Sequence, residues 1–296
     1  MSDALSKRIE ASLEESLSCA VGLGSPPTLR EALHHAVFPA GGRIRPRLCL
    51  EVARACGAPS SPLAEGAATA IELVHCASLV HDDLPCFDDA PTRRGQPSVH
   101  AAYGEATAVL AGDALIVLAF ETLARRGEHA PGQVVALVRT LARYVGGAHG
   151  IIAGQAWEVE SSVPLAAYHR AKTASLFEAA VVSGAVAAGH DGAAWRALGD
   201  RLGMAYQVAD DLADAVGLAS DLGKPVGRDG ELGRPSAARE LGVEGASRRL
   251  YRLLDDARDA VPPCAGRAEI LAWLRKTLDA LLVSRGVDSV RRSAVA

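Results

Sequence analysis

Two clusters of carboxylates are the residues in this chain best placed to do chemistry. The first consists of Asp82 and Asp83, which end an apolar helical stretch just before Pro85, and of Asp88 in the loop that follows. The helix ends there because proline disfavours the helical conformation of the residue that precedes it. Carboxylates in the last turn of a helix face the negative end of its dipole, and such a local conflict is typical of a functional site. We expect a cation to be bound between these acids.

The second cluster occupies one face of a helix. Gln207, Asp210, Asp211 and Asp214 are spaced at i, i+3, i+4 and i+7, which aligns them in a single stripe. Alone, such a stripe is equally compatible with a solvated acidic surface. Here it follows another acidic cluster, and a loop rich in glycine and cations comes after it at 222–235. Mg²⁺ is commonly held by one or two carboxylates together with substrate phosphates, so the pattern predicts Mg²⁺ and a diphosphate, with Arg or Lys completing the charge balance.

The elements that must position these acids are helices, because the apolar residues recur with helical periodicity throughout and alternating strand patterns are absent. We predict an all-α bundle that forms a single domain over 1–296. The expected helices lie near 3–20, 28–37, 44–56, 61–83, 101–126, 131–146, 148–160, 164–188, 192–217, 237–260 and 266–284.

Composition narrows the class of protein. The net charge of −4 neither suggests nor excludes a nucleic-acid partner, but no basic tract occurs, so no such partner is expected. The N-terminal stretch lacks the basic and unbroken apolar regions of a signal peptide, and no uninterrupted apolar run reaches the roughly 18 residues of a membrane span. Six scattered cysteines without a CxxC pair indicate reduced thiols. We therefore predict a cytoplasmic protein without a membrane span.

Five short motifs join the two acidic clusters in a specific order. They are 41–46 (GGRIRP), 93–97 (RRGQP), 154–158 (GQAWE), 172–173 (KT) and 223–224 (GK), with the acidic clusters at 82–88 (DDLPCFD) and 210–214 (DDLAD). In this order and spacing, residues 25–285 resemble the trans-isoprenyl diphosphate synthases, or polyprenyl synthetases, and are most similar to bacterial geranylgeranyl diphosphate synthases of carotenoid pathways. The resemblance implies an isoprenoid-synthase helical bundle around a central cavity and a homodimer.

The resemblance also implies a role for each matching residue. The metal ligands, for two to three Mg²⁺ per active site, are Asp82, Asp83, Asp88, Asp210, Asp211 and Asp214, with Glu158 supporting the metal network. The allylic diphosphate is bound by Arg93, Lys172 and Lys224, and isopentenyl diphosphate by Arg43, Arg45, His75 and Arg94. Lys172, Thr173 and Gln207 form the catalytic set, in which the last two offer oxygen dipoles to an allylic carbocation. Asp229 and Arg234 belong to a loop expected to close over the diphosphate.

One position departs from the family pattern. Gly42 stands where the family has a lysine that binds isopentenyl diphosphate, and Arg43 or Arg47 is the candidate to compensate. A further doublet, Asp255-Asp256, lies on a charged helix and is assigned no metal.

The reaction implied is head-to-tail prenyl transfer. Diphosphate leaves dimethylallyl, geranyl or farnesyl diphosphate, the double bond of isopentenyl diphosphate attacks the allylic cation, and a proton is lost. Ala77 and Ser78 lie about one turn before Asp82, where an aromatic residue closes the pocket in relatives that stop at fifteen carbons. Because both residues are small, we predict a twenty-carbon product, geranylgeranyl diphosphate.

Four alternatives remain at this point. A farnesyl diphosphate synthase differs only in its product. A non-catalytic partner subunit tends to lose one aspartate motif and a terpene cyclase to change the second, whereas both motifs are intact here. A diphosphate hydrolase would need water to reach the cation. Supplying an allylic substrate alone separates these classes, since a cyclase or hydrolase consumes it whereas a synthase also needs isopentenyl diphosphate.

Overall fold

A computed structural model describes residues 2–20, 24–38, 41–216 and 236–284 of the chain. The chain forms two compact units, with unit 1 comprising Met1–Leu141 and Val182–Gly192, and unit 2 comprising Ala142–Val181 and Ala193–Ala296. Helices account for most of the described residues, which confirms the prediction of an all-α protein. The single domain over 1–296 stays a prediction.

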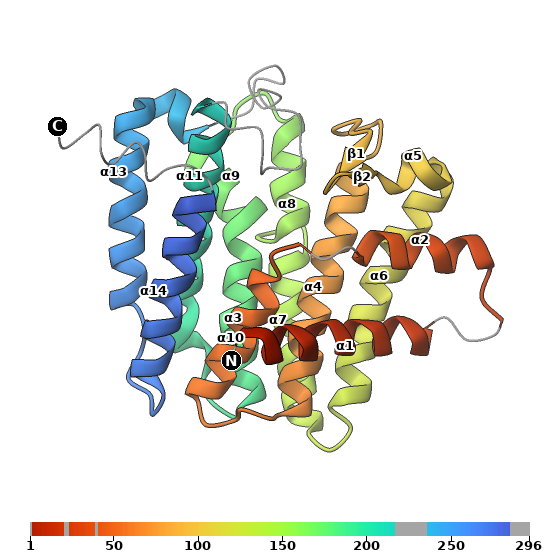
Figure 1. Ribbon diagram of the computed structural model, residues 1–296, viewed down its shortest axis with the longest axis horizontal. Coiled ribbons are helices and arrows are strands. Elements are labelled where there is room, and N and C mark those ends of the chain that lie inside the picture. Colours follow the sequence, from red (N-terminus) through yellow and green to blue (C-terminus); the bar gives the residue numbers. More distant parts are fainter. Residues whose placement is uncertain (1, 21–23, 39–40, 217–235, 285–296) are drawn as a thin grey trace. The chain divides into compact units, whose positions relative to one another are not determined.

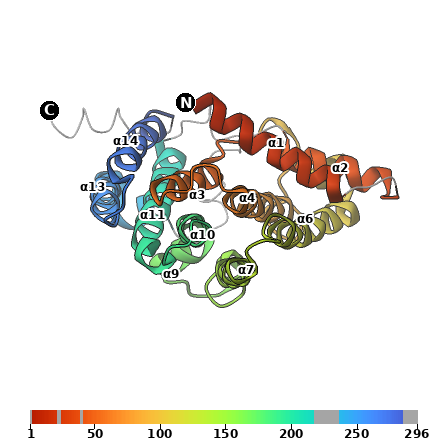
Figure 2. The same ribbon diagram turned by 90° about the horizontal axis from the view of Figure 1, so that it is seen from below.

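Unit 1 is built on two helices that lie side by side, α4 and α6, with α1 crossing both of them (Figure 1, Figure 2). Its elements are α1 (Ser2–Ala20), α2 (Pro27–Val37), α3 (Ile44–Ala55), α4 (Pro62–Asp82), β1 (Thr92–Arg93), β2 (Gln96–Pro97), α5 (Val99–Tyr103), α6 (Glu105–Arg126) and most of α7 (Pro131–Val145).

Helix α4 is the core helix of unit 1. Its N-terminus is capped by the Ser61 hydroxyl, which accepts a hydrogen bond from the Ala64 N–H at 3.2 Å, and Pro62 takes the first helical position, where its missing N–H costs nothing. Both α4 and α6 contain an 18-residue window apolar enough to span a membrane by length and composition. In α4 that window is 78 % buried inside the structure, as in the core helix of a soluble protein.

Helix α6 is separated from α5 by Gly104, whose φ of +85° lies in a region that favours glycine. The sequence predicts one continuous helix over 101–126, whereas the structure has two helices separated at Gly104. Further along α6, Gly112 admits the ring of His81 from α4, because a Cβ at residue 112 would lie 2.0 Å from His81 Nε2. The two helices therefore approach each other closely at the residue that immediately precedes Asp82.

The loop after α4 contains a small hairpin that the sequence pattern did not predict. Strands β1 and β2 pair antiparallel, with Arg93 opposite Gln96. Between them, Arg94 and Gly95 both have positive φ, +52° and +77°, as in the two-residue turns that match the twist of a β-hairpin. Strands of two residues are too short to show an alternating pattern, so only Gly95 at the second turn position could have signalled the hairpin.

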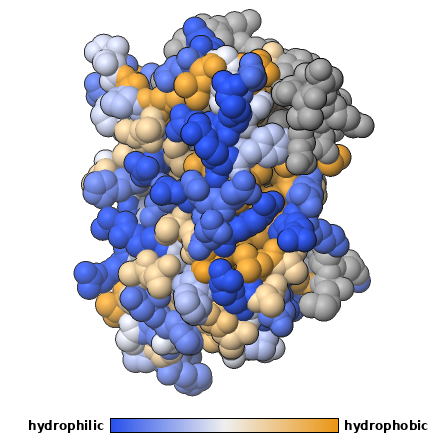
Figure 3. Space-filling model, turned by 90° about the vertical axis from the view of Figure 1, so that its left-hand side faces the viewer, coloured by the Kyte–Doolittle hydropathy of each residue, from blue (hydrophilic) through white to orange (hydrophobic). Residues whose placement is uncertain are grey.

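Unit 2 contains the remaining helices, among which α11, α13 and α14 lie together at the left of Figure 1. Its elements are α8 (Ile151–Ala156), η1 (Trp157–Val159), α9 (Leu165–His169), η2 (Arg170–Ala174), the first half of α10 (Ser175–Ala187), η3 (Gly192–Trp195), α11 (Arg196–Val216), α13 (Ala237–Asp259) and α14 (Arg267–Ser284). Hydrophilic side chains cover most of the face seen in Figure 3.

The segment expected to be one helix over 164–188 is interrupted by η2, a turn of π-helix. Two glycines press on this turn: a Cβ on Gly154 of α8 would lie 2.4 Å from the backbone N of Lys172, and a Cβ on Gly203 of α11 would lie 2.3 Å from the Cα of Ala174. At both glycines the backbone of the neighbouring helix therefore packs directly against the backbone of η2. Such π-helical turns are frequent at functional sites, and η2 carries Lys172 and Thr173.

Candidate active site

The first aspartate motif folds back on itself at the end of α4. The Asp88 N–H donates to the Asp82 carbonyl at 3.0 Å, and the Ala90 N–H donates to the Asp83 carbonyl at 3.1 Å. As a result, carboxylate oxygens of Asp82 and Asp88 lie within 4.8 Å of each other. All three aspartates are buried. Closely spaced, buried carboxylate oxygens are the donors that a hard cation such as Mg²⁺ takes, so this set fits the predicted metal.

Arg93 from β1 joins this acidic set. Its Nε lies 3.0 Å from Asp83 Oδ1 and 3.1 Å from Oδ2, and Nη2 also donates to Oδ1. Burial alone would lower the pKa of Arg93, but the hydrogen bond to Asp83 and the charges of Asp83, Asp82 and Asp88 outweigh burial and raise it. The hairpin therefore brings a permanent cation to the motif, and binding of the allylic diphosphate by Arg93 stays a prediction.

A second group of cations gathers around His75 on α4. Arg45 Nη1 of α3 lies 3.3 Å from His75 Nε2, and because a guanidinium only donates, the imidazole nitrogen accepts. The guanidinium of Arg94 lies against the backbone of Gly41, where a Cβ would be 2.7 Å from Nη2. All four residues predicted to bind isopentenyl diphosphate therefore belong to one electropositive neighbourhood.

His75 is uncharged in this neighbourhood. Its pKa is held well below the ordinary 6.5 by burial and by the positive charges of Arg45, Arg94, Arg43 and Arg93. In the folded protein the imidazole therefore stays neutral at pH values where it would be protonated in the unfolded chain. A neutral imidazole can accept from Arg45 through Nε2 and keep a donor at Nδ1.

The shift of His75 predicts how stability depends on pH. Above pH 6.5 both states are neutral at this residue, and as pH falls below 6.5 the unfolded chain binds a proton that the folded protein does not. Stability is therefore lost on acidification, and between about pH 7.5 and pH 5.5 we expect wild type to lose about 1 kcal/mol more than His75→Asn. Urea unfolding at both pH values measures this difference, and equal losses in the two proteins would contradict the neutral assignment.

Arg43, the fourth predicted ligand of isopentenyl diphosphate, has other partners. Its side chain is only 3 % exposed and forms ion pairs with Glu10 of α1 and Glu72 of α4. Its direct contact with the diphosphate stays a prediction.

In unit 2, Lys172 is part of a polar cluster around Glu158. Lys172 Nζ and the Tyr168 hydroxyl both donate to Glu158 Oε1, the latter at 2.6 Å, and Gln155 Nε2 donates to Oε2 at 3.1 Å. Tyr168 was not singled out from the sequence, since nothing in its local pattern marks it. The motif 154–158 and Lys172 are thus neighbours in the structure.

Two members of the catalytic set that the resemblance implies, Thr173 and Gln207, are also brought together in unit 2. The Thr173 hydroxyl donates to Gln207 Oε1 at 2.5 Å, and Gln207 Nε2 donates to Asp211 Oδ1 at 2.9 Å. This chain of hydrogen bonds fixes the amide of Gln207 with its oxygen toward Thr173. Both residues can then present oxygen lone pairs to a positive charge that develops near them.

Asp211 differs from its two neighbours in the second aspartate motif. It is buried, and its Oδ2 accepts from the Ala237 N–H of α13 at 2.7 Å and lies 3.4 Å from His169 Nε2. Asp210 and Asp214 are half-buried on the same helix. Metal binding by these three residues stays a prediction, and Asp211 has at least one structural task because it caps the N-terminus of α13.

The two residues predicted to set the chain length, Ala77 and Ser78, lie on α4. Ala77 is buried on α4, and Ser78 is half-buried beside it with its hydroxyl donating to the His75 carbonyl at 2.8 Å. Lys224, Asp229 and Arg234 lie outside the described residues.

Three comparisons with known proteins are consistent with this arrangement. Residues 26–261 match the family model described as polyprenyl synthetase. The chain is 50% identical over 273 residues to a geranylgeranyl diphosphate synthase of Cereibacter sphaeroides. The aligned region covers 92% of this chain and 95% of that protein. Another, from Rhodobacter capsulatus, is 49% identical over 90% of this chain and 92% of its own length. Among solved structures, the geranyltransferase of Helicobacter pylori complexed with magnesium and isoprenyl diphosphate is 31% identical, with a TM-score of 0.79 over 95% of this chain and 96% of that one.

Proposed function

The chain belongs to the polyprenyl synthetase family, and from that premise we propose that it is a Mg²⁺-dependent geranylgeranyl diphosphate synthase. It condenses isopentenyl diphosphate head-to-tail with dimethylallyl, geranyl or farnesyl diphosphate. The observation that carries the proposal is the 50% identity, over nearly the full length of both chains, to a protein named for this product. That identity also favours the twenty-carbon product over the farnesyl alternative.

We propose that the aspartate motifs hold two to three Mg²⁺ ions. Asp82, Asp83 and Asp88 supply buried carboxylates in unit 1, and Asp210 and Asp214 supply half-buried ones in unit 2. Bound Mg²⁺ would neutralise the allylic diphosphate and make it a better leaving group. The magnesium named with the structure of the Helicobacter pylori relative supports this choice of ion.

The side chains of the protein supply positioning and charge stabilisation. Arg93 and Lys172 orient the allylic diphosphate, while Arg45, Arg94 and neutral His75 donate hydrogen bonds to the diphosphate of isopentenyl diphosphate. The hydroxyl of Thr173 and the amide oxygen of Gln207 stabilise the allylic cation as diphosphate departs. No protein nucleophile takes part, since the attacking group is the double bond of the second substrate held in place.

A product assay tests the proposal. Purified protein receives labelled isopentenyl diphosphate and Mg²⁺ with each of the three allylic diphosphates in turn, and the products are sized by chromatography. A twenty-carbon diphosphate is expected from every starter. A fifteen-carbon product would keep the chemistry and contradict the chain length, whereas consumption of an allylic substrate alone would indicate a cyclase or hydrolase.

We also propose that two copies associate through the outer face of α6. Leu110 and Val117 are seven residues apart on one face of this helix, and both side chains are exposed, that of Val117 by 68 %. Val109, beside Leu110, is also exposed. The opposite face packs on α4. Apolar side chains gathered on one exposed helix face are typical of a surface buried in an oligomer. The cytoplasmic location and the lack of a nucleic-acid partner stay predictions.

The dimer proposal predicts a change of mass. Wild type should have about twice the 30.6 kDa mass of one chain in solution, and Val117→Asp should sediment as a monomer because a buried carboxylate opposes association. Val283→Asp is the matched control, since Val283 is a valine of similar exposure, 64 %, on α14. Sedimentation of Val117→Asp like wild type would contradict the assignment of α6 to the interface.

A further inference from the structure

We infer that the N-terminal helix α1 positions the isopentenyl diphosphate site, with Glu10 acting through Arg43. This inference rests on the proposed function, because it takes Arg45, His75 and Arg94 as the group that binds the diphosphate. Helix α1 (Ser2–Ala20) precedes residues 26–261, which match the family.

Every donor group of the Arg43 side chain is engaged. Nε and Nη2 donate to the two carboxylate oxygens of Glu10 at 2.9 and 3.1 Å, Nη1 donates to Glu72 Oε1 at 2.7 Å, and Nη2 also donates to the Val37 carbonyl at 2.9 Å. Paired contacts of this kind fix the plane of a guanidinium as well as its position. Arg43 is thus held in place from α1, from α4 and from the end of α2.

The charge at this point cannot easily be removed. Burial by itself would lower the pKa of Arg43, but the hydrogen bond to Glu10 and the charge of Glu72 outweigh burial and raise it. A buried arginine that loses one of its two carboxylates keeps its charge and loses part of its compensation. The position of Arg43 therefore depends on Glu10, which is the partner contributed by α1.

Arg43 is also the residue that starts α3. Its backbone has φ +47° and ψ +36°, a left-handed conformation that is costly for a residue with a side chain, and its carbonyl accepts from the Arg47 N–H at 3.2 Å. The side-chain contacts hold this backbone in place. Arg45 lies in the first turn of α3. The backbone position of Arg43 therefore sets the direction in which the Arg45 side chain extends toward His75.

Helix α1 holds the same turn at its other end. Arg47 Nη2 donates to the Ser6 hydroxyl at 2.5 Å. Glu10 and Ser6 are one helical turn apart on α1, and their partners, residues 43 and 47, are one turn apart across the start of α3. Arg45 lies between these two attachments. The geometry points to α1 as the support that aligns Arg45, and it makes Glu10 and Arg43 positioning residues.

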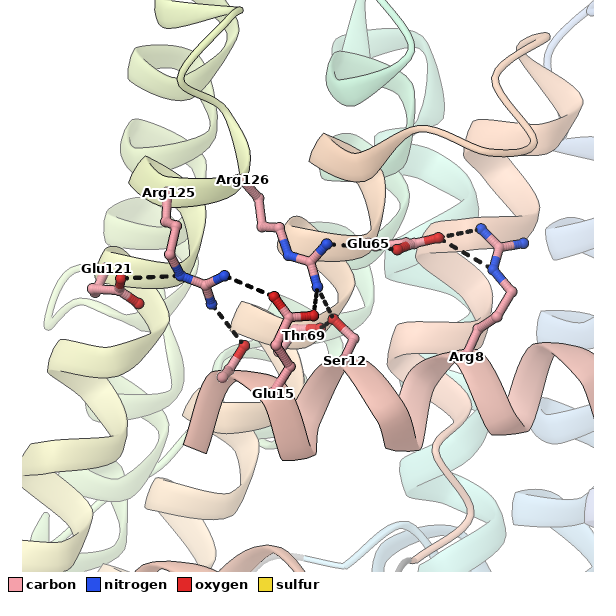
Figure 4. A network of polar contacts seen from close by, with 9 residues as sticks. Arg8, Ser12, Glu15, Glu65, Thr69, Glu121, Arg125 and Arg126 are labelled. Atoms are coloured by element: carbon pink, nitrogen blue, oxygen red, sulfur yellow. Dashed lines mark hydrogen bonds and ion pairs between the residues drawn. The ribbon is translucent and has the colours of Figure 1, made fainter. Parts of the chain in front are cut away.

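The remaining contacts of α1 provide a matched control (Figure 4). Glu15 accepts from Arg125 Nη1 at 3.0 Å and from Arg126 Nη2 at 2.6 Å, and Arg8 pairs with Glu65. These contacts fasten α1 to α6 and α4 without touching Arg43. Loss of Glu15 therefore removes ion pairs between α1 and α6 but leaves Glu10 on Arg43.

The experiment compares Glu10→Gln with Glu15→Gln in the full-length protein. Gln at position 10 keeps one acceptor oxygen and loses the charge and the second acceptor. We expect KM for isopentenyl diphosphate to rise about tenfold in Glu10→Gln, equivalent to about 1.4 kcal/mol, while KM for the allylic substrate changes by less than about twofold. Glu15→Gln should leave both values within about twofold of wild type. Hydrogen–deuterium exchange of the amides at 44–48 should be faster in Glu10→Gln only.

Several results would overturn the inference. One is an unchanged KM for isopentenyl diphosphate in Glu10→Gln, and another is an equal rise for both substrates, which a loss of overall stability would cause. Equal exchange rates at 44–48 in the two variants would also contradict it. If wild type forms no prenyl product, the proposed function fails, and the exchange measurement still decides whether Glu10 holds the start of α3.

Discussion

Asp82→Asn should abolish nearly all prenyl transfer while leaving the fold intact. The carboxylates of Asp82 and Asp88 lie within 4.8 Å of each other and are buried, so both can bind one ion. An amide at position 82 keeps the shape and removes the charge that holds Mg²⁺. We expect kcat to fall about a thousandfold or more, the scale seen when a preorganised electrostatic contact to the transition state is lost. Initial rates with labelled isopentenyl diphosphate measure the effect.

Asp255→Asn is the matched control for this substitution. Asp255 also belongs to an Asp-Asp doublet on a helix, but it is exposed and pairs with Arg258 at 2.7 Å. Its loss should leave kcat within about twofold, since exposed ion pairs contribute little. Circular dichroism of both variants checks that they are folded. A fall in kcat of less than about tenfold in Asp82→Asn would remove this residue from the metal site.

Ser78→Phe should change the product from twenty carbons to fifteen. Ser78 is four residues before Asp82 on α4, so the two side chains lie on the same helix face one turn apart. If the growing chain extends from the diphosphate back along this helix, an aromatic ring at position 78 stops elongation one isoprene unit earlier. Chromatography of the products with geranyl and farnesyl diphosphate as starters measures the change, and farnesyl diphosphate should cease to be elongated.

Ser78→Ala separates bulk from the loss of the hydroxyl. It removes the hydrogen bond to the His75 carbonyl without adding volume, so the twenty-carbon product should persist. Substitution at the half-buried Ser78 is a better test than one at Ala77, which is 1% exposed and where an aromatic would overpack the core. A twenty-carbon product from a folded Ser78→Phe variant would show that the chain grows in another direction.

The parts of the site that could be predicted from the sequence are those that violate a local rule. Asp82 and Asp83 were identified because acids at a helix C-terminus oppose its dipole, and Gln207 and Asp211 because their spacing places them on one helix face. Both inferences use only residues close together in the chain. The helix bounds followed from proline and glycine in the same way, and most ends agree within one or two residues.

The parts that could not be predicted depend on partners far away in sequence. Glu10 lies 33 residues from Arg43 and Glu72 lies 29 residues from it, and nothing local links them. The sequence therefore suggests that Arg43 is a further cation for the diphosphate, whereas in the structure it pairs with the buried Glu72 and the partly exposed Glu10. Nothing local signals the π-helical turn at η2 either, and the backbone of this turn packs against Gly154 and Gly203, which lie on other helices.

The direct contact between backbones at η2 limits how this protein can evolve. Where side chains separate two helices, a substitution can be absorbed by a change of rotamer, but a Cβ on Gly154 or Gly203 would meet main-chain atoms at 2.4 and 2.3 Å. Neither helix can yield without moving Lys172 or Thr173. New substrate preferences should therefore arise through side chains of α4 such as Ser78, and laboratory selection for other chain lengths should leave both glycines untouched.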